Sequence, residues 1–208
     1  MTFNCFVEWI TKLVPFFKEL CIAFAAVGGF VIALLGLRTW RKELKGKTEY
    51  DLARRILATT YKIRNAIQSV RNPFMPPSEY SGTESGKNEK DAQDQGIAEA
   101  YQKRWNFVNE GLIELDVVTL EAEAIWGPEI LEDMKPLKEC SKELFINIKH
   151  YLLIRQSEVY REQMLKEKSE KIEKIIYSGN SPDDDEFYRS LLDAVKKIEE
   201  RVKPHLQR

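Results

Sequence analysis

The sequence predicts an all-α protein in which an N-terminal amphipathic segment and a single transmembrane helix precede an antiparallel bundle of about four long helices. Three observations predict this fold class. Residues 20–37 form an uncharged, mostly apolar run of 18 residues, nearly long enough to cross a bilayer core. Beyond this run, apolar residues recur at steps of three and four, which is the spacing of one helix face. No stretch alternates with period two for long enough to indicate a sheet.

The apolar run and its flanks predict where the chain works. Basic flanks of membrane spans stay on the cytoplasmic side, and the basic residues here follow the run. The N-terminus is therefore expected outside and the C-terminal domain in the cytoplasm. A cleaved signal peptide is disfavoured because the run has no small-residue cleavage pattern. A merely buried helix is the other alternative.

The residues just after the run suit lipid headgroups, because basic and aromatic side chains are favoured at that depth. The expected headgroup contacts are Arg38, Trp40, Arg41, Lys42, Lys45 and Lys47. Small residues within the run recur every fourth position, at Ala25, Gly29 and Ala33. Such a ridge lets two helix backbones approach in lipid, so these three are candidate transmembrane packing residues.

The chain is expected to contain four segments. They are an amphipathic interfacial segment (1–19), the transmembrane helix (20–37), a basic juxtamembrane collar (38–47) and a cytoplasmic helical domain (48–208). A flexible loop is expected over 75–95, where proline, serine, glycine and charge predominate. Pro15 should bend or end the first segment, although this segment could instead extend the anchor as one kinked helix.

Helix boundaries follow from capping residues, glycine and proline. Gly46 indicates a break, and Thr48 with Asp51 reads as a capping box that starts the next helix. That helix should stop at Asn72, before a proline, where a hydrophobic contact of Phe74 is expected. Further helices are predicted over about 91–126, 128–134, 136–177 and from 182 to 203.

The last of these helices has the sharpest start signal in the chain. Ser181 is the expected N-cap, Pro182 the first helical residue, and four acidic residues load the first turn. The preceding charged stretch, 159–176, carries sparse apolar residues and is a candidate docking strip that projects from the bundle.

Charge is balanced overall, at −1, so composition predicts no nucleic-acid partner. Its distribution is uneven: residues 38–71 hold ten Lys and Arg, and residues 91–135 hold eleven Asp and Glu. These blocks could face each other as packed helices, or each could be a solvated face.

The sequence indicates no catalytic, metal or cofactor site. His150 and His205 are the only histidines, and neither has a nucleophile at an interpretable spacing. No C-x-x-C or Glu-x-x-His pair occurs, and glycine-rich phosphate loops are absent. The four glutamates Glu110, Glu114, Glu121 and Glu123 therefore do not predict a di-iron site. No small-molecule substrate is expected.

Residues 40–55 (WRKELKGKTEYDLARR) and 70–74 (VRNPF) resemble a block shared by uncharacterised single-span bacterial membrane proteins. The resemblance covers about a fifth of the chain. It implies a bacterial inner-membrane (cell-membrane) protein with a helical cytoplasmic domain, and it supplies no catalytic residues.

These observations favour a non-enzymatic, membrane-anchored helical scaffold or interaction module, which self-associates or binds a protein partner at the cytoplasmic membrane face. The expected partners are the lipid bilayer and a protein. The alternative is a membrane-perturbing effector of the toxin or phage-defence type, acting through residues 1–37. An enzyme or ligand sensor built in the bundle is a third class, for which a large polar pocket between helices would be the sign.

Overall fold

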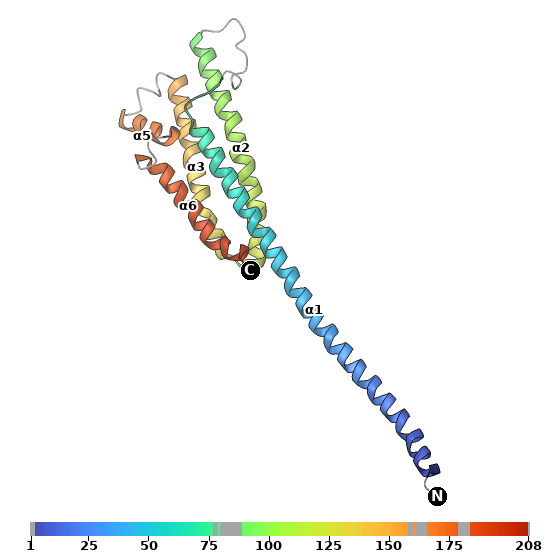
Figure 1. Ribbon diagram of the computed structural model, residues 1–208. Coiled ribbons are helices and arrows are strands. Elements are labelled where there is room, and N and C mark those ends of the chain that lie inside the picture. Colours follow the sequence, from blue (N-terminus) through green and yellow to red (C-terminus); the bar gives the residue numbers. More distant parts are fainter. Residues whose placement is uncertain are drawn as a thin grey trace. The chain divides into compact units, whose positions relative to one another are not determined.

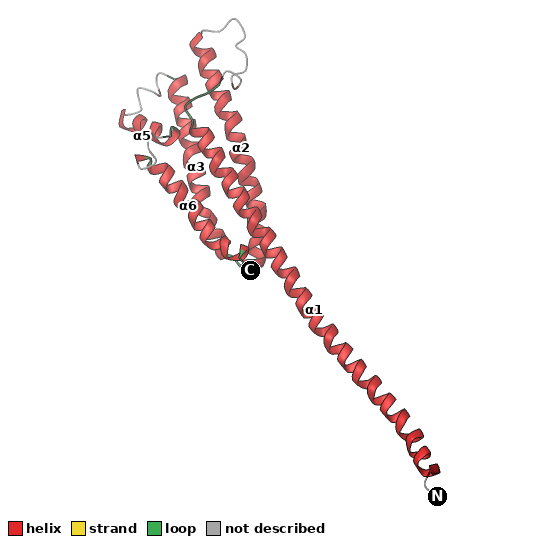
Figure 2. Cartoon of the chain, in the orientation of Figure 1, coloured by secondary structure: helices red, strands yellow, loops and turns green. Residues whose placement is uncertain are grey.

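The computed structural model describes residues 3–76, 79, 89–157, 160, 166–178 and 184–207, with side chains from residue 18 onwards except at 20, 21, 23, 89, 166 and 167. Its helices are α1 (Phe3–Arg71), α2 (Glu89–Trp126), α3 (Glu129–Gln156), α5 (Lys166–Ile176), α6 (Glu186–Val202) and the short 3₁₀ helix η3 (Lys203–Leu206). Within the described ranges there is no strand, so the all-α class is confirmed (Figure 2). The chain divides into two compact units, Met1–Thr48 and Glu49–Arg208.

In the second unit, the C-terminal part of α1 lies beside α2 (Figure 1) and also contacts α6. Arg55 and Lys62 of α1 pair with Glu121 and Glu114 of α2, so part of the basic block faces part of the acidic block. On the other side of α1, the Tyr61 hydroxyl donates to Glu199 of α6. Helix α3 packs against α2, α5 and α6.

Contacts at the two ends give the helix directions. At one end, Arg71 at the close of α1 meets Asp185, the N-cap of α6. At the other end, His205 of η3 stacks on Trp126, the last residue of α2, and approaches Glu49. Within this unit α1, α2, α3 and α6 therefore run alternately up and down.

The core is built from the helix stripes that the sequence predicts. The buried stripe residues include, on α1, Leu52, Ile56, Ile63, Ile67 and Val70; on α2, Tyr101, Val108 and Leu115; on α3, Leu137, Leu144 and Ile148; and on α6, Phe187, Leu191, Val195, Ile198 and Val202. Ile125 was expected on the α2 stripe but is exposed. At this end of α2 the neighbouring Trp126, and not Ile125, packs against the core.

The expected break at Gly46 and the helix start at Thr48 are wrong. Helix α1 passes through both positions, and a Cβ on Gly46 would meet open space. The Thr48 hydroxyl donates to the Leu44 carbonyl one turn back (3.0 Å) instead of capping a new helix. This intrahelical bond is the usual alternative for a threonine inside a helix.

Helix α1 also contains Pro15, so the helix does not end there. The proposed placement of residues 1–19 in the membrane interface depends largely on side chains outside the described part and stays a prediction. The expected loop 75–95 is too long at its C-terminal end, because α2 already begins at Glu89. The helix stop before Pro73 is confirmed, but Phe74, which was expected to make a hydrophobic contact, is 72 % exposed.

The expected boundary between helices at 134–136 is wrong, because α3 runs from Glu129 to Gln156 through Pro136. The helix expected to continue to 177 instead ends at Gln156, and α5 begins at Lys166. Proline has no N–H for the carbonyl four residues back, which here belongs to Glu132. Lys197 of α6 supplies the missing donor, with its Nζ 3.0 Å from that carbonyl oxygen. Tertiary packing therefore makes the helix interior tolerate a proline that the sequence pattern treats as a helix start.

Two expectations near α5 and α6 are also corrected. The N-cap of α6 is Asp185, whose carboxylate accepts from the Tyr188 N–H (2.9 Å), while the expected cap Ser181 lies outside the described residues. Ile172 and Ile176 of the expected docking strip are buried, and their helix packs on α3. The described part of the strip therefore offers no such exposed apolar surface; Val159 and Met164 lie outside it.

Candidate membrane-contact and interaction sites

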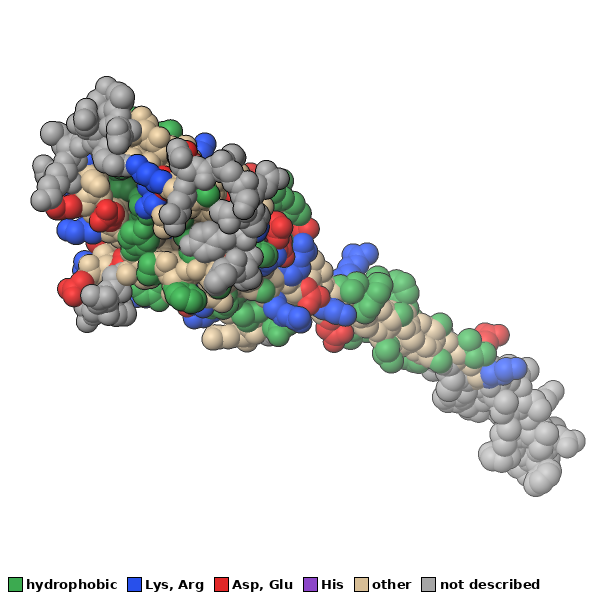
Figure 3. Space-filling view, turned by 90° about the horizontal axis from the view of Figure 1, so that it is seen from above, with side chains coloured by type: hydrophobic (Ala, Val, Ile, Leu, Met, Phe, Trp, Pro, Cys, Tyr) green, Lys and Arg blue, Asp and Glu red, His purple; other side chains and the backbone are tan. Residues whose placement is uncertain are grey.

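The apolar run leaves its side chains open. One helix near the N-terminus is long and apolar enough to cross a membrane, and none of its apolar window is buried against the described chain. Phe24, Phe30 and Ile32 are each more than 60 % exposed. Figure 3 shows this band of apolar side chains on α1 between charged ones. Fully burying one large apolar side chain is worth roughly 1.5–3 kcal/mol, so removing such a run from water is favourable.

The basic collar continues the same helix. Because α1 is unbroken there, Arg38, Arg41, Lys42 and Lys45 follow the i, i+3, i+4, i+7 spacing and share one face. Lys47 falls on the other side of the helix, next to the direction of Trp40. All six expected headgroup residues are exposed. The collar is thus a helical surface with four cations on one side, and not a loop that separates two helices.

The small-residue ridge is also exposed. Ala25, Gly29 and Ala33 lie one turn apart on α1, and a Cβ added at Gly28, Gly29 or Gly36 would meet no atom within 4 Å. Nothing in the described chain therefore requires glycine at these positions.

The glutamates of α2 act as ion-pair partners. Glu114 lies 3.0 Å from Lys62 Nζ and Glu121 2.7 Å from Arg55 Nη1, all about half exposed. The Lys62 hydrogen bond lowers the pKa of the Glu114 carboxyl below its ordinary value. Among the described residues, no three His, Cys, Asp or Glu side chains converge as metal ligands.

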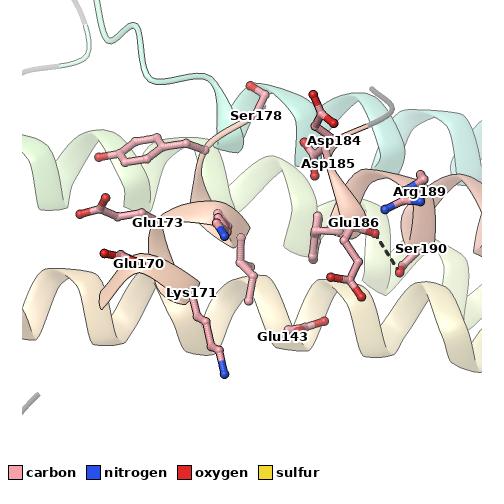
Figure 4. Close-up of a pocket in the computed structure, with 14 residues that line it drawn as sticks. Glu143, Glu170, Lys171, Glu173, Ser178, Asp184, Asp185, Glu186, Arg189 and Ser190 are labelled. Carbon is pink, nitrogen blue, oxygen red and sulfur yellow. Dashed lines mark hydrogen bonds between the residues drawn. The ribbon is translucent and has the colours of Figure 1, made fainter. Parts of the chain in front are cut away.

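A cleft of about 820 Å³, lined mostly by charged residues, lies where α3, α5 and α6 meet. In Figure 4, Glu170, Lys171 and Glu173 approach it from α5, and Glu186, Arg189 and Ser190 from the start of α6. Its described lining contains no histidine, and the Ser178 and Ser190 hydroxyls donate to backbone carbonyls of Arg71 and Glu186. Both serine hydroxyls thus donate to backbone carbonyls and not to a side chain that could take up their proton.

Cys140 is a free cysteine, and it is buried. Burial raises the pKa of its thiol above the ordinary value, and the nearby Glu143 and Glu139 act in the same direction. Because the thiolate is the reactive form, this cysteine is poorly suited to nucleophilic chemistry.

Sequence reasoning missed a buried arginine that organises the cleft wall. The Arg71 guanidinium makes a two-bond pair with the Asp185 carboxylate (2.8 and 3.0 Å) and lies over the Phe187 ring. It also donates to the carbonyls of three α5-end residues, Lys174, Ile175 and Tyr177. Its position four residues after Ile67, in phase with the apolar stripe, was the available signal.

A second buried arginine plays the same part near the end of α1. Arg104 of α2 donates to the carbonyls of Ser69, Asn72 and Phe74, and pairs with Glu79 (2.7 Å). It too stands in stripe register, three residues after Tyr101. Both arginines satisfy loop carbonyls, so they hold structure and are not presented to a ligand.

No protein-family model, curated protein or solved structure matches this chain.

Proposed function

We propose that this chain is a non-enzymatic, single-pass module of the bacterial inner membrane that holds a helical domain at the cytoplasmic face. The observation that carries the proposal is the apolar window of α1, of which no part is buried by the described chain. A core helix of a water-soluble domain passes the same test of length and composition, but its window is mostly buried. Lipid is the environment that fits an exposed window of this length.

The collar supports the orientation. Four cations on one helix face, directly after the window, favour the cytoplasmic side and attract anionic headgroups. The second unit has its own core, so its outer helix faces are available for protein contacts. We propose that it binds a protein partner or a second copy of itself. The proposal assigns it no catalytic, metal or cofactor site.

Membrane fractionation of the full chain tests the anchor. We expect the protein to remain with membranes after an alkaline carbonate wash, and a variant with Val31→Lys and Ile32→Lys in the window to be released. The matched control, Lys substitutions at the exposed Ile146 and Leu153 of α3, should leave the protein in the membrane. Release of the unmodified protein by the wash would contradict the anchor.

Protease accessibility of a C-terminal tag tests the orientation. In sealed inside-out vesicles the tag should be cleaved, and in right-side-out vesicles it should be protected; the reverse pattern would overturn the cytoplasmic placement. The same vesicles, loaded with dye, test the alternative role of residues 1–37. Dye release caused by the full chain would favour a membrane-perturbing effector over an anchor.

A further inference from the structure

Helix α2 carries an apolar stripe on its outer face. Ile113, Val117 and Leu120 are 58 %, 51 % and 64 % exposed, and they are spaced four and three residues apart. Ala124, four residues further on, is exposed as well. The buried residues Leu115, Val118 and Ala122 occupy the opposite side of the same helix. We call Ile113, Val117, Leu120 and Ala124 the outer stripe.

The spacing of the outer stripe is that of a coiled-coil seam. Steps of four, three and four place its members at successive d, a, d and a positions of a heptad. A helix face with this pattern fits a second helix laid alongside it. Nothing in the described chain covers the stripe.

Both flanks of the outer stripe carry paired charges. On the side towards α1 are the Lys62–Glu114 and Arg55–Glu121 pairs, and on the side towards α3 is the Lys138–Asp116 pair. Each flank therefore contains acids and bases close together. Two identical surfaces of this kind can meet without a block of like charge, which a symmetric contact requires.

We propose that a second copy of this chain covers the outer stripe, with the two α2 helices parallel about a twofold axis and the Ala25–Gly29–Ala33 ridges of the two anchors in contact. The inference rests on the proposed membrane anchoring, which inserts both copies in one bilayer with the same orientation. In a parallel pair, the α1-side flank of one copy faces the α3-side flank of the other. Arg55 and Lys62 then approach the acidic Asp116 and Glu123 of the second copy.

A second copy of the chain would account for two features that otherwise have no role. The glycines of the anchor face open space, and the outer stripe exposes large apolar side chains in the other unit. The stripe lies in the C-terminal half of α2, which ends at Trp126 close to His205 and Glu49. Glu49 is where the second unit continues into the anchor-bearing unit along α1. Because each anchor is covalently joined to its second unit, contact between anchors raises the effective concentration of the two stripes for each other.

The size of the stripe shows why the membrane matters. The stripe consists of three large apolar side chains that are 51–64 % exposed and one alanine, which form much less surface than the roughly 800 Å² per partner of a stable soluble interface. Two anchors in one bilayer raise the effective concentration of the second contact and add their own packing. We therefore expect pairing of the full chain in lipid to need both contacts.

Cysteine cross-linking of the full chain in liposomes, at a low protein-to-lipid ratio, tests the proposal. In a background where Cys5, Cys21 and Cys140 are replaced by Ala, Val117→Cys should give cross-linked dimers at least tenfold more efficiently than Lys196→Cys, an exposed position on α6. Adding Leu120→Asp should lower the Val117→Cys yield at least tenfold. The matched change Leu153→Asp, on an exposed leucine of α3, should leave it unchanged.

The anchor contact has its own test in the same assay. Gly29→Leu should reduce the Val117→Cys yield several-fold, whereas Val31→Leu, on another face of α1, should not. Equal cross-linking yields for Val117→Cys and Lys196→Cys, in protein that resists the carbonate wash, would contradict the proposal that a second copy covers the outer stripe. The proposed membrane anchoring would then still stand. Loss of the protein from liposomes in that wash would instead remove the proposed function on which the pairing rests. An unchanged Val117→Cys cross-linking yield in Gly29→Leu would show that the Ala25–Gly29–Ala33 ridge is not part of the interface.

Discussion

Arg71 illustrates what a single buried charge does in this fold. Its side chain is almost fully buried and joins the end of α1 to the end of α5 and the N-cap of α6. Taking an ion pair out of water is costly, and the full set of hydrogen bonds to the guanidinium offsets that cost. The pair is thus strongly coupled: removing one member leaves the other buried and unpaired.

We predict that Arg71→Met lowers the free energy of unfolding by about 3–5 kcal/mol, because Asp185 and three carbonyls lose their donor. The matched change Arg55→Met removes an ion pair that is half exposed and should cost only about 0–1 kcal/mol. Urea unfolding of the full chain in nanodiscs, followed by tryptophan fluorescence, measures both. Similar losses for the two variants would show that burial of the Arg71–Asp185 pair contributes little.

Tyr101 makes stability depend on pH in the alkaline range. Its ring is buried against Tyr151, with ring centroids 5.9 Å apart. Burial, reinforced by the charge interaction with Tyr151, raises the pKa of Tyr101 from 10.0 to about 12. The folded state therefore keeps the phenol proton when the unfolded chain has already lost it.

The sign of the effect follows from that difference. The protonated Tyr101 phenol contributes its full share of the folding stability below pH 10. This share is lost as pH rises towards 12, because the unfolded state releases its proton first. Tyr101→Phe cannot ionise, so its stability should fall less over this range, by roughly 2–3 kcal/mol. Urea midpoints measured at intervals between these two pH values test this. Parallel declines in the two proteins would assign the alkaline loss to other groups.

At the scale of helices, the sequence predicts core faces well and interruptions poorly. The apolar stripes of α1, α2, α3 and α6 depend on spacing within one segment, which is visible in the sequence. Whether Gly46 ends a helix, or Pro136 begins one, depends on what lies beside it in space. Glu132 keeps its place in α3 because Lys197, sixty-five positions away, donates to its carbonyl.

The candidate sites divide in the same way. The collar and the small-residue ridge are runs of neighbouring residues, so the sequence alone identifies them. Arg71 and Asp185 lie 114 positions apart, and only the folded chain brings them together. The acidic start of α6 was assigned to helix-dipole electrostatics, while Asp185 within it both caps that helix and neutralises Arg71. The outer stripe of α2 was missed because only the fold determines which apolar residues stay outside.

Two glycines in helices should respond in opposite directions to the same substitution. Gly46→Ala meets open space and should stabilise α1 locally by about 1 kcal/mol, since alanine is the better helix former. Gly111→Ala would place its Cβ 2.7 Å from Ile63 Cγ1, so α1 and α2 must separate or Ile63 must move. We expect a loss of about 1–3 kcal/mol there.

Hydrogen exchange distinguishes these effects by location. Gly46→Ala should slow amide exchange around residues 44–50 about fivefold and leave the bundle core unchanged, whereas Gly111→Ala should speed exchange in the core of α1 and α2. Faster exchange around residue 46 in Gly46→Ala would indicate that α1 needs flexibility between its two units.

For the whole molecule, the collar is expected to decide orientation. The ten positions after the apolar run contain five basic residues, whereas the ten before it contain Lys12 and Lys18. Cations near the cytoplasmic surface gain about 1 kcal/mol each from anionic lipid. Replacing Arg38, Arg41, Lys42 and Lys45 by Gln leaves one basic residue after the run against two before it, so the bias favouring the cytoplasmic side is lost.

We predict that the variant with these four Gln substitutions inserts with mixed orientation. Protease added to spheroplasts should then cleave the C-terminal tag in a substantial fraction of molecules. The control neutralises four exposed lysines of the second unit, Lys142, Lys149, Lys168 and Lys196, and changes net charge by the same amount. It should retain the original orientation, because charge acts on topology only close to the span. Complete protection of the tag in both variants would mean that the collar serves lipid binding or protein contact and not orientation. Mixed orientation in the control alone would show that charge in the second unit, and not the collar, sets the direction of insertion.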